Sequence, residues 1–417
     1  MSIPPLNKPP KRGLSQMQMG YLAIAWVAVS IIIGVCAFVA LFWFQGGFSA
    51  VTPQPTQTAA VALVVTNTLP PPPPPTNTPE PGAPTAVPLP PLTDFMLGGQ
   101  TIHGGIPGVD KIKASGMTWV KIQCCSAQDG LTIDFGPAIQ NAHNNGLRIL
   151  ISVVDKTDNR YRVTDPAYQQ QYADYVINLA RQGADAIEVW NEMNIDREWP
   201  SGQISGTSYA QFINFVAPQI KAANPNTWVI SGAPSPTGFF GGACGPTGCD
   251  DKPFIEQMAA AGVFANANVD CLGIHYNEGL VSPTLSTGDP RGNSNHYTRY
   301  YQTMVDTYYT ASDGVKPLCF TELGYLSAEE WGYLPGNFSW KPPINLTVAE
   351  QAQFLGEAAQ LSKQQGKVRL LIVFNVDFTG YPGPEVTEGD PQGGYAIIRP
   401  DSSCPACNSL AAVMATP

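Results

Sequence analysis

Between residue 92 and the C-terminus, a short apolar segment followed by a helical pattern occurs eight times. The apolar segments are rich in β-branched residues and short enough to be buried strands, and they are Phe95–Ile102, Trp119–Cys125, Arg148–Val154, Ala186–Glu192, Trp228–Ala233, Cys271–Tyr276, Leu318–Glu322 and Leu370–Phe374. Helical patterns follow at Val109–Ser115, Phe135–Asn144, Pro166–Gln182, Ser208–Ala223, Lys252–Ala261, Tyr297–Tyr309, Val348–Gln365 and Pro405–Met414. Eight such units predict an α/β protein of the (β/α)8 TIM barrel type.

The connections distinguish this barrel from an open doubly wound sheet. The open sheet usually carries a G-x-G-x-x-G phosphate turn, and none follows the first predicted strand. Helix-to-strand connections are mostly short, whereas the segments after strands four to seven, 193–207, 234–251, 277–296 and 323–347, are long. Because barrel enzymes build their clefts from such loops, we expect residues 92–417 to form one barrel with a cleft at the carboxyl ends of its strands.

An uncharged, mostly apolar run of 24 residues, 21–44, is long enough to cross a bilayer as a helix. A cleaved signal peptide is the alternative, but the run exceeds the usual apolar region and no clear small-x-small site follows it closely. Three basic residues precede the run, and no Lys or Arg follows until Lys111. The positive-inside rule therefore places residues 1–20 in the cytoplasm and predicts a single-pass anchor in the cell membrane, with the barrel outside.

Residues 45–91 join the predicted span to the predicted barrel. From Val51 to Pro91 there are 14 prolines in 41 residues, interleaved with Thr, Ala and Val. Such a composition cannot build a packed core, and we expect a disordered, partly polyproline II stalk that reaches up to about 130 Å.

Charge and histidine content narrow the range of ligands. The net charge is −10 and the predicted barrel contains no basic run, which argues against nucleic acid and against docking on anionic lipid. The four histidines, His103, His143, His275 and His296, show no metal-ligand spacing, so no metal or other cofactor is expected. A neutral carbohydrate ligand fits this composition.

Four of the nine cysteines form two candidate pairs. Cys244 and Cys249 flank a Gly-Pro-Thr-Gly segment, and Cys404 and Cys407 form Cys-x-x-Cys, so both pairs are disulfide candidates outside the cell. Cys271 and Cys319 lie within apolar segments and are expected to be small core residues.

Two glutamates end predicted strands. Glu192 closes Ala186–Glu192 and Glu322 closes Leu318–Glu322, so both are expected at the same face of the barrel. A pair of carboxyl groups at strand ends is the minimum equipment for cleaving a glycosidic bond. Glu188 has the same parity as Glu192 and is expected inside the barrel in a structural role. Glu278 and Asp155 also lie near strand ends and are the rival carboxylates if the strand register differs.

The motif Trp190-Asn191-Glu192 on strand four and Thr321-Glu322-Leu323-Gly324 on strand seven resemble the clan A, or 4/7, glycoside hydrolases, which include families 5 and 39. The resemblance extends from about Leu92 to the C-terminus. It implies that Glu192 is the general acid/base and Glu322 the nucleophile of a retaining double displacement, for which the carboxyls must lie about 5 to 5.5 Å apart. It also implies that Asn191 binds the sugar 2-hydroxyl.

On strand six, His275-Tyr276 resembles the family's His/Tyr element. The expected assignment is Tyr276 to the nucleophile contact and His275 to the ligand. Strand eight departs from the family, because Asn375 and its neighbours stand where many relatives have a tryptophan platform. Strand two carries Lys121 and Gln123 where several relatives have an arginine near the nucleophile. Other ligand candidates are Asn375 after strand eight, His103 after strand one and the loop tryptophans Trp199, Trp331 and Trp340, whose rings could replace the missing platform.

These observations predict a membrane-anchored, outward-facing retaining glycoside hydrolase that acts on a polysaccharide or oligosaccharide. Two alternatives remain open: a barrel on a stalk that binds carbohydrate without cleaving it, and a transglycosylase that uses the same two glutamates. Asn337-Phe338-Ser339 and Asn345-Leu346-Thr347 also match the N-glycosylation sequon.

Overall fold

The computed structural model describes residues 87–102, 106, 108–125, 130–378 and 391–416. These residues belong to one compact unit, Pro81–Pro417. The predicted tail, membrane span and nearly all of the stalk lie outside the described residues, as does His103. Within the described part of the chain, no helix is sufficiently long and apolar to span a bilayer.

Eight parallel strands form the centre of the unit. They are β1 (Met96–Gln100), β2 (Trp119–Cys124), β3 (Arg148–Val153), β4 (Ala186–Val189), β5 (Trp228–Ser231), β6 (Leu272–Tyr276), β7 (Leu318–Leu323) and β8 (Val368–Val373). Their order is β5-β4-β3-β2-β1-β8-β7-β6. An isolated parallel bridge between Ile230 and Cys271 joins the two outer strands. The predicted (β/α)8 barrel is therefore confirmed.

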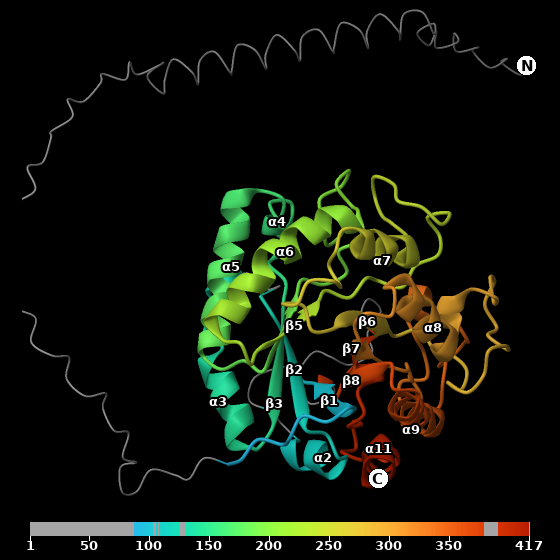
Figure 1. Ribbon diagram of the computed structural model, residues 1–417. Coiled ribbons are helices and arrows are strands. Elements are labelled where there is room, and N and C mark those ends of the chain that lie inside the picture. Colours follow the sequence, from blue (N-terminus) through green and yellow to red (C-terminus); the bar gives the residue numbers. More distant parts are fainter. Residues whose placement is uncertain (1–86, 103–105, 107, 126–129, 379–390, 417) are drawn as a thin grey trace, which may run out of the picture. The chain divides into compact units, whose positions relative to one another are not determined.

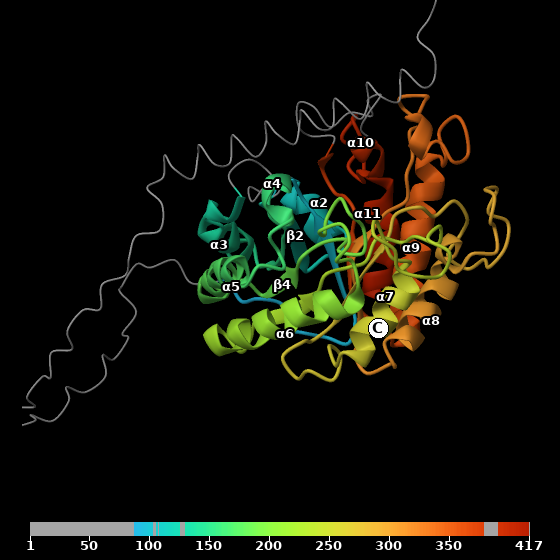
Figure 2. The ribbon, with the colours of Figure 1, turned by 90° about the horizontal axis from the view of Figure 1, so that it is seen from above.

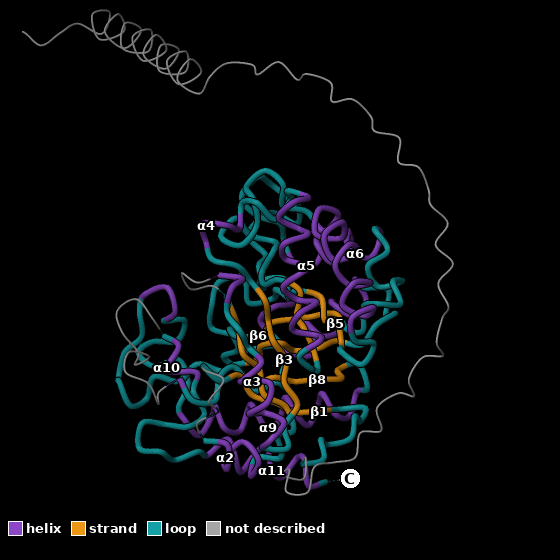
Figure 3. Tube along the Cα trace, turned by 90° about the vertical axis from the view of Figure 1, so that its left-hand side faces the viewer, coloured by secondary structure: helices purple, strands orange, loops and turns teal. Residues whose placement is uncertain are grey.

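Helices surround the strands, as Figures 1 and 2 show from two directions. The described helices are α2 (Val109–Ala114), α3 (Gly136–Asn144), α4 (Thr157–Arg160), α5 (Pro166–Arg181), α6 (Gly206–Ala223), α7 (Asp251–Ala260), α8 (Tyr301–Ala311), α9 (Val348–Gln365), α10 (Gln392–Tyr395) and α11 (Pro405–Ala415). In Figure 3 the strands lie in the middle of the unit with helices around them. Asp165 caps α5, and Thr347 with Glu350 forms a capping box on α9.

The barrel interior is layered. One apolar layer includes Trp119, Ala186 and Cys319, which are all buried. Two residues further along β2 and β4, on the same face of each strand, stand Lys121 and Glu188, which are fully buried polar residues. The interior thus changes from apolar to charged toward the carboxyl ends of the strands.

The end of β4 differs from the prediction. The strand stops at Val189, three residues before Glu192, because Trp190 and Glu192 have left-handed φ values of 76° and 41°. The Trp190 ring is buried and packs edge to face against Trp199 and Phe212, with centroid distances of 5.8 Å to each. This packing fixes the turn from which Glu192 projects.

Four disulfides are present among the described residues. Cys244 is joined to Cys249, and Cys404 to Cys407. The prediction for Cys271 and Cys319 was wrong, because these buried residues, one directly before β6 and the other on β7, form a third disulfide with a Cα separation of 5.9 Å. The fourth joins two neighbours in sequence, Cys124 and Cys125, which sequence analysis did not pair.

Candidate active site

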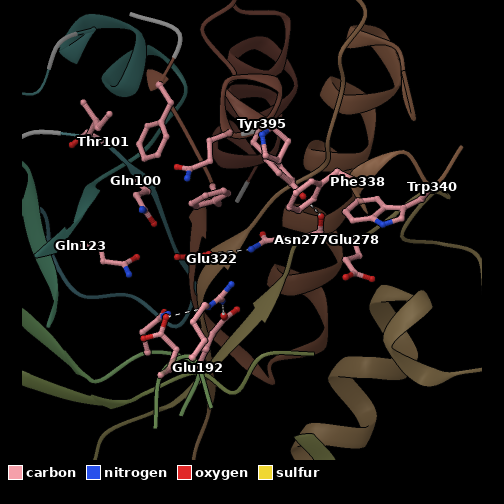
Figure 4. Close-up of a pocket in the computed structure, with 18 residues that line it drawn as sticks. Gln100, Thr101, Gln123, Glu192, Asn277, Glu278, Glu322, Phe338, Trp340 and Tyr395 are labelled. Carbon is pink, nitrogen blue, oxygen red and sulfur yellow. Dashed lines mark hydrogen bonds and ion pairs between the residues drawn. The ribbon is translucent and has the colours of Figure 1, made fainter. Parts of the chain in front are cut away.

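A pocket of about 640 Å³ opens at the carboxyl ends of the strands. Figure 4 shows Gln100, Thr101 and Gln123 on one side, Phe338 and Trp340 on the opposite side, and Glu322 between them. The lining residues are Gln100, Thr101, Ile102, Gln123, Asn191, Glu192, Arg197, Glu198, Asn277, Glu278, Glu322, Phe338, Trp340, Phe374, Phe378, Pro391, Gln392 and Tyr395. Both strand-end glutamates therefore face one cavity.

A single ring nitrogen holds the two glutamates close together. His275 Nδ1 lies 3.4 Å from Glu192 Oε1 and 3.9 Å from Glu322 Oε2. These two carboxylate oxygens are consequently no more than about 7 Å apart, a limit that is compatible with the roughly 5 to 5.5 Å between the carboxyl groups of retaining pairs.

Both oxygens of Glu322 accept hydrogen bonds from buried or half-buried donors. Lys121 Nζ donates to Oε1 at 3.1 Å, and Asn277 Nδ2 donates to Oε2 at 3.0 Å. The Lys121 side chain is fully buried and also lies 3.6 Å from Glu188 Oε2. Lys121 thus supplies a cation directly beside Glu322.

Glu188 is the ion-pair partner of Lys121 inside the barrel. Its Oε1 accepts a hydrogen bond from the Thr321 hydroxyl at 2.7 Å and another from the Ala233 N–H at 3.3 Å. With no exposed surface, Glu188 cannot reach a ligand in the pocket. Its position agrees with the predicted structural role inside the barrel.

Glu192 has different surroundings from Glu322. Its Oε2 pairs with the guanidinium of Arg197, and its Oε1 faces His275. Burial by itself raises the pKa of Glu192, but the hydrogen bond and charge of His275, together with the charge of Arg197, outweigh burial and lower it. Burial likewise opposes the protonated form of His275, yet the charges of Glu322 and Glu192 raise the pKa of this histidine.

Three amide oxygens in the pocket wall have no hydrogen-bond partner among the described residues. They are Gln100 Oε1, Asn191 Oδ1 and Asn277 Oδ1. Gln100 and Asn191 are only 4% and 6% exposed, so little water reaches them. Because an unpaired buried acceptor is costly, a rotation of these side chains toward the cavity would be stabilised by a ligand that brings several hydroxyl donors.

The expected roles of His275 and Tyr276 were wrong. His275 is only 1% exposed and contacts both glutamates, so it orients them and does not line the pocket. Tyr276 points the other way, because successive side chains of a strand alternate, and its hydroxyl donates to the Arg299 carbonyl. The same alternation brings Asn277 back to the pocket, where it makes the contact with Glu322 that was assigned to Tyr276.

Three other ligand candidates also lie away from the pocket. Trp199 is 1% exposed and packs against Trp190, so it supports the β4 turn. Trp331 packs against a separate apolar cluster and under the guanidinium of Arg399 at 5.4 Å. Asn375 is fully buried and bonds the carbonyl of Gln392 with Nδ2, so its amide stabilises the loop after β8. Each of these side chains is therefore engaged in apolar packing or in a hydrogen bond to the backbone and is not available to a ligand.

Of the loop tryptophans, Trp340 lines the pocket, on the side opposite Gln123. The guanidinium of Arg291 lies 5.3 Å from its ring centroid and so supports it from outside. Glu278 also lines the pocket, but it is paired with Arg291 and with Arg299. The other rival carboxylate, Asp155, is fully buried and accepts a hydrogen bond from Tyr168, so it is not available to a ligand.

No three His, Cys, Asp or Glu side chains of the described ranges are grouped so that they could hold a metal ion. The second sequon is structural, because Asn345 is 2% exposed and its amide bonds the Phe338 carbonyl and the N–H of Trp340. Asn337 of the first sequon is exposed on the same loop.

Fold and site together define a (β/α)8 barrel with a close carboxylate pair at the ends of β4 and β7. Comparison with solved structures finds the same barrel in a psychrophilic glycoside hydrolase family 10 endo-β-1,4-xylanase, which is 11% identical, with 76% of this chain and 96% of that chain covered and a TM-score of 0.50. An endo-1,4-β-xylanase from Caldicellulosiruptor owensensis is 10% identical over 76% and 96% of the two chains, also with a TM-score of 0.50. A xylanase from Cellvibrio japonicus in complex with xylopentaose is 9% identical over 77% and 67%, again at 0.50.

These similarities show the fold. No protein-family model and no curated protein matches the sequence.

Proposed function

We propose that this protein is a retaining glycoside hydrolase that cleaves O-glycosidic bonds of a polysaccharide or oligosaccharide. The observation that carries the proposal is the convergence of Glu192 and Glu322 on the Nδ1 atom of His275 within one pocket. Retaining hydrolysis needs two carboxyl groups at short separation, one ionised and one able to exchange a proton.

The contacts assign a role to each glutamate. Glu322 is held through both oxygens by Lys121 and Asn277, which fixes its carboxylate in one position, as a nucleophile requires. Oε2 of Glu192 is held by Arg197, whose side chain is 65% exposed and can move away. Glu192 is therefore the general acid/base, because only this residue must gain and lose a proton during the reaction.

The pocket suits a neutral sugar ring at the reacting centre. Asn191, Gln100 and Asn277 line it with amide side chains whose oxygens lack a partner among the described residues, and Trp340 supplies an aromatic ring. Xylo-oligosaccharides are the first natural substrates to test, since the xylanases named above share the barrel.

We also propose that residues 21–44 anchor the protein in the cell membrane and that the barrel faces outward on the stalk. The support is the apolar run, the basic residues before it and the disulfides of the barrel. The substrate would then lie in or near the cell envelope.

A carbohydrate-binding barrel without catalysis would be favoured by separated carboxylates or by a pocket plugged by residues 323–347. Instead the carboxylates are close, and that loop contributes Phe338 and Trp340 to the wall of an open cavity. The same residues could transfer the sugar to an acceptor other than water, which product analysis with and without an added acceptor would detect.

The test is a screen of the full-length protein against aryl β-glycosides and xylo-oligosaccharides, repeated with Glu322→Gln. The variant should lose at least about a thousandfold in kcat while keeping its folded circular dichroism spectrum. Turnover by the variant at the wild-type rate would refute the assignment of Glu322. Binding of oligosaccharides by a wild-type protein that cleaves none of them would favour the binding barrel.

A further inference from the structure

Both carboxylate oxygens of Glu192, the proposed general acid, are in contact with another side chain. Oε1 of Glu192 faces the ring of His275, and Oε2 is paired with Arg197. A general acid must present a protonated oxygen to the oxygen of the scissile bond. In the arrangement described here, neither oxygen of Glu192 can do so until one of its partners moves.

The two partners differ in their freedom to move. His275 is 1% exposed and lies within the barrel, beneath both glutamates. The Arg197 side chain is 65% exposed, and among the described residues it is the one basic residue that lines the pocket. If a partner leaves when a glycoside arrives, it is Arg197.

A second carboxylate is already within reach of Arg197. Its Nε lies 3.4 Å from Oε1 of Glu198, whose other oxygen pairs with Arg160 at 2.5 Å. Arg160 holds the Glu198 carboxylate, and the buried Trp190 ring holds the Glu198 backbone carbonyl with a 2.9 Å hydrogen bond, so this carboxylate has a defined position. Arg197 therefore stands between two glutamates and can give up the first while keeping the second.

We propose that Arg197 is a positioning residue that covers the general acid Glu192 before a glycoside enters and transfers to Glu198 when the substrate occupies the pocket. This inference rests on the proposed glycosidase function. Arg197 stays protonated throughout and only changes its partner. Glu192, once uncovered, takes a proton from solvent and passes it to the glycosidic oxygen as Glu322 attacks the anomeric carbon. As a carboxylate it then removes a proton from the water that releases the sugar.

The charges that face Glu192 decide the direction of the expected effects. They are His275 on β6, Arg197 and Glu198 on the loop after β4, and Glu322 on β7 across the histidine. Without Arg197, Glu192 should keep its proton to higher pH. Without the charge of Glu198, Arg197 has one partner left, and Glu192 should lose its proton at lower pH.

The experiment compares four full-length proteins: wild type, Arg197→Gln, Glu198→Gln and the double variant. Arg181→Gln is the matched control, since it makes the same charge change at the exposed far end of α5. The first readout is kcat/KM for an aryl glycoside from pH 4 to 9. The second is the ¹³C carboxyl titration of Glu192 in glutamate-labelled protein, assigned with Glu192→Gln, which needs no turnover.

The compared quantity is kcat/KM at pH 8 divided by its value on the acid side of the profile. This ratio should be roughly three to ten times higher in Arg197→Gln than in wild type, and it should be lower in Glu198→Gln than in wild type. The effect of Glu198→Gln should shrink when Arg197 is absent, and Arg181→Gln should match wild type. Coincident titrations of Glu192 in wild type and Arg197→Gln, or shifts of both variants in the same direction, would overturn the proposal. A wild type that hydrolyses no glycoside would instead remove the proposed function, while the carboxyl titration would still report the Arg197 contact.

Discussion

Lys121→Met tests the charged layer beneath the active site. The Lys121 side chain is fully buried, with its Nζ 3.1 Å from Glu322 Oε1 and 3.6 Å from Glu188 Oε2. At an effective dielectric constant near 20, each of these attractions is about 5 kcal/mol, and the cost of burying the charges offsets much of it. Removing one partner of a buried pair typically costs about 3 to 5 kcal/mol, because the remaining charges are left uncompensated. That is a large part of a total folding free energy of about 5 to 15 kcal/mol.

A second substitution separates stability from catalysis. Glu188→Gln in the Lys121→Met background removes one of the two stranded carboxylates and should recover roughly 1 to 3 kcal/mol of the loss. It should not recover activity, because Glu322 still lacks a charge-assisted hydrogen bond. Such a bond contributes about 1.5 to 3 kcal/mol, so kcat/KM should stay roughly 10 to 100 times below wild type in both variants.

The assay is urea unfolding followed by tryptophan fluorescence, with kcat/KM measured on the same preparations. Lys121→Met should lower the midpoint without changing the slope of the free energy against urea. A midpoint equal to that of wild type would refute the reasoning, since it would mean that the barrel tolerates two buried carboxylates without a cation. Full recovery of kcat/KM in the double variant would refute the role of Lys121 at Glu322.

Two further predictions follow from the surroundings of the site. Burial raises the pKa of Asp377 to about 7, against a lowering hydrogen bond from the Ile102 N–H, so in the folded protein the protonated acid predominates below that pH. The free energy of unfolding should therefore fall as the pH rises from about 4 through 7, by up to about 4 kcal/mol for this group. Between pH 5 and pH 8, the melting temperature of Asp377→Asn should fall by less than that of wild type. Trp340→Ala should lower kcat/KM for oligosaccharides about three- to tenfold by removing a stacking face, whereas Trp331→Ala should lower the unfolding midpoint and leave kcat/KM unchanged. Equal effects of the two tryptophan substitutions on kcat/KM would contradict the placement of the pocket.

Periodicity was sufficient to predict the barrel. Each predicted strand overlaps an observed one, and the bounds of β7 and β8 differ from the predicted bounds by no more than two residues at either end. Counting strands also placed Glu192 and Glu322 at one face, because every strand of a parallel barrel ends on the same side. The Cys271–Cys319 pair was missed for a related reason: their proximity depends on the register between β6 and β7, which hydrophobic pattern alone does not reveal.

Asn277 could have been found from the sequence. If His275 faces the glutamates, alternation sends Tyr276 toward α8 and returns Asn277 to the pocket, two residues further on. The tryptophans could not have been sorted in this way. Trp199, Trp331 and Trp340 all stand on long loops, and which ring is buried depends on partners such as Trp190 and Arg291 that lie elsewhere in the chain.

Strict alternation fails at β7, and this failure is what brings the charged layer and the nucleophile together. Thr321 bonds Glu188 inside the barrel, and the next residue, Glu322, bonds Lys121, although consecutive strand residues normally face opposite sides. The pairing of β7 with β8 shifts between Phe320 and Leu323, and an irregularity of this kind turns an extra residue inward. At the end of β4, the left-handed backbone of Trp190 and Glu192 likewise departs from strand geometry and directs Glu192 toward the pocket. Side-chain periodicity therefore locates the two carboxylates to within a residue, whereas local departures from it, which the sequence pattern does not record, set the geometry in which they meet.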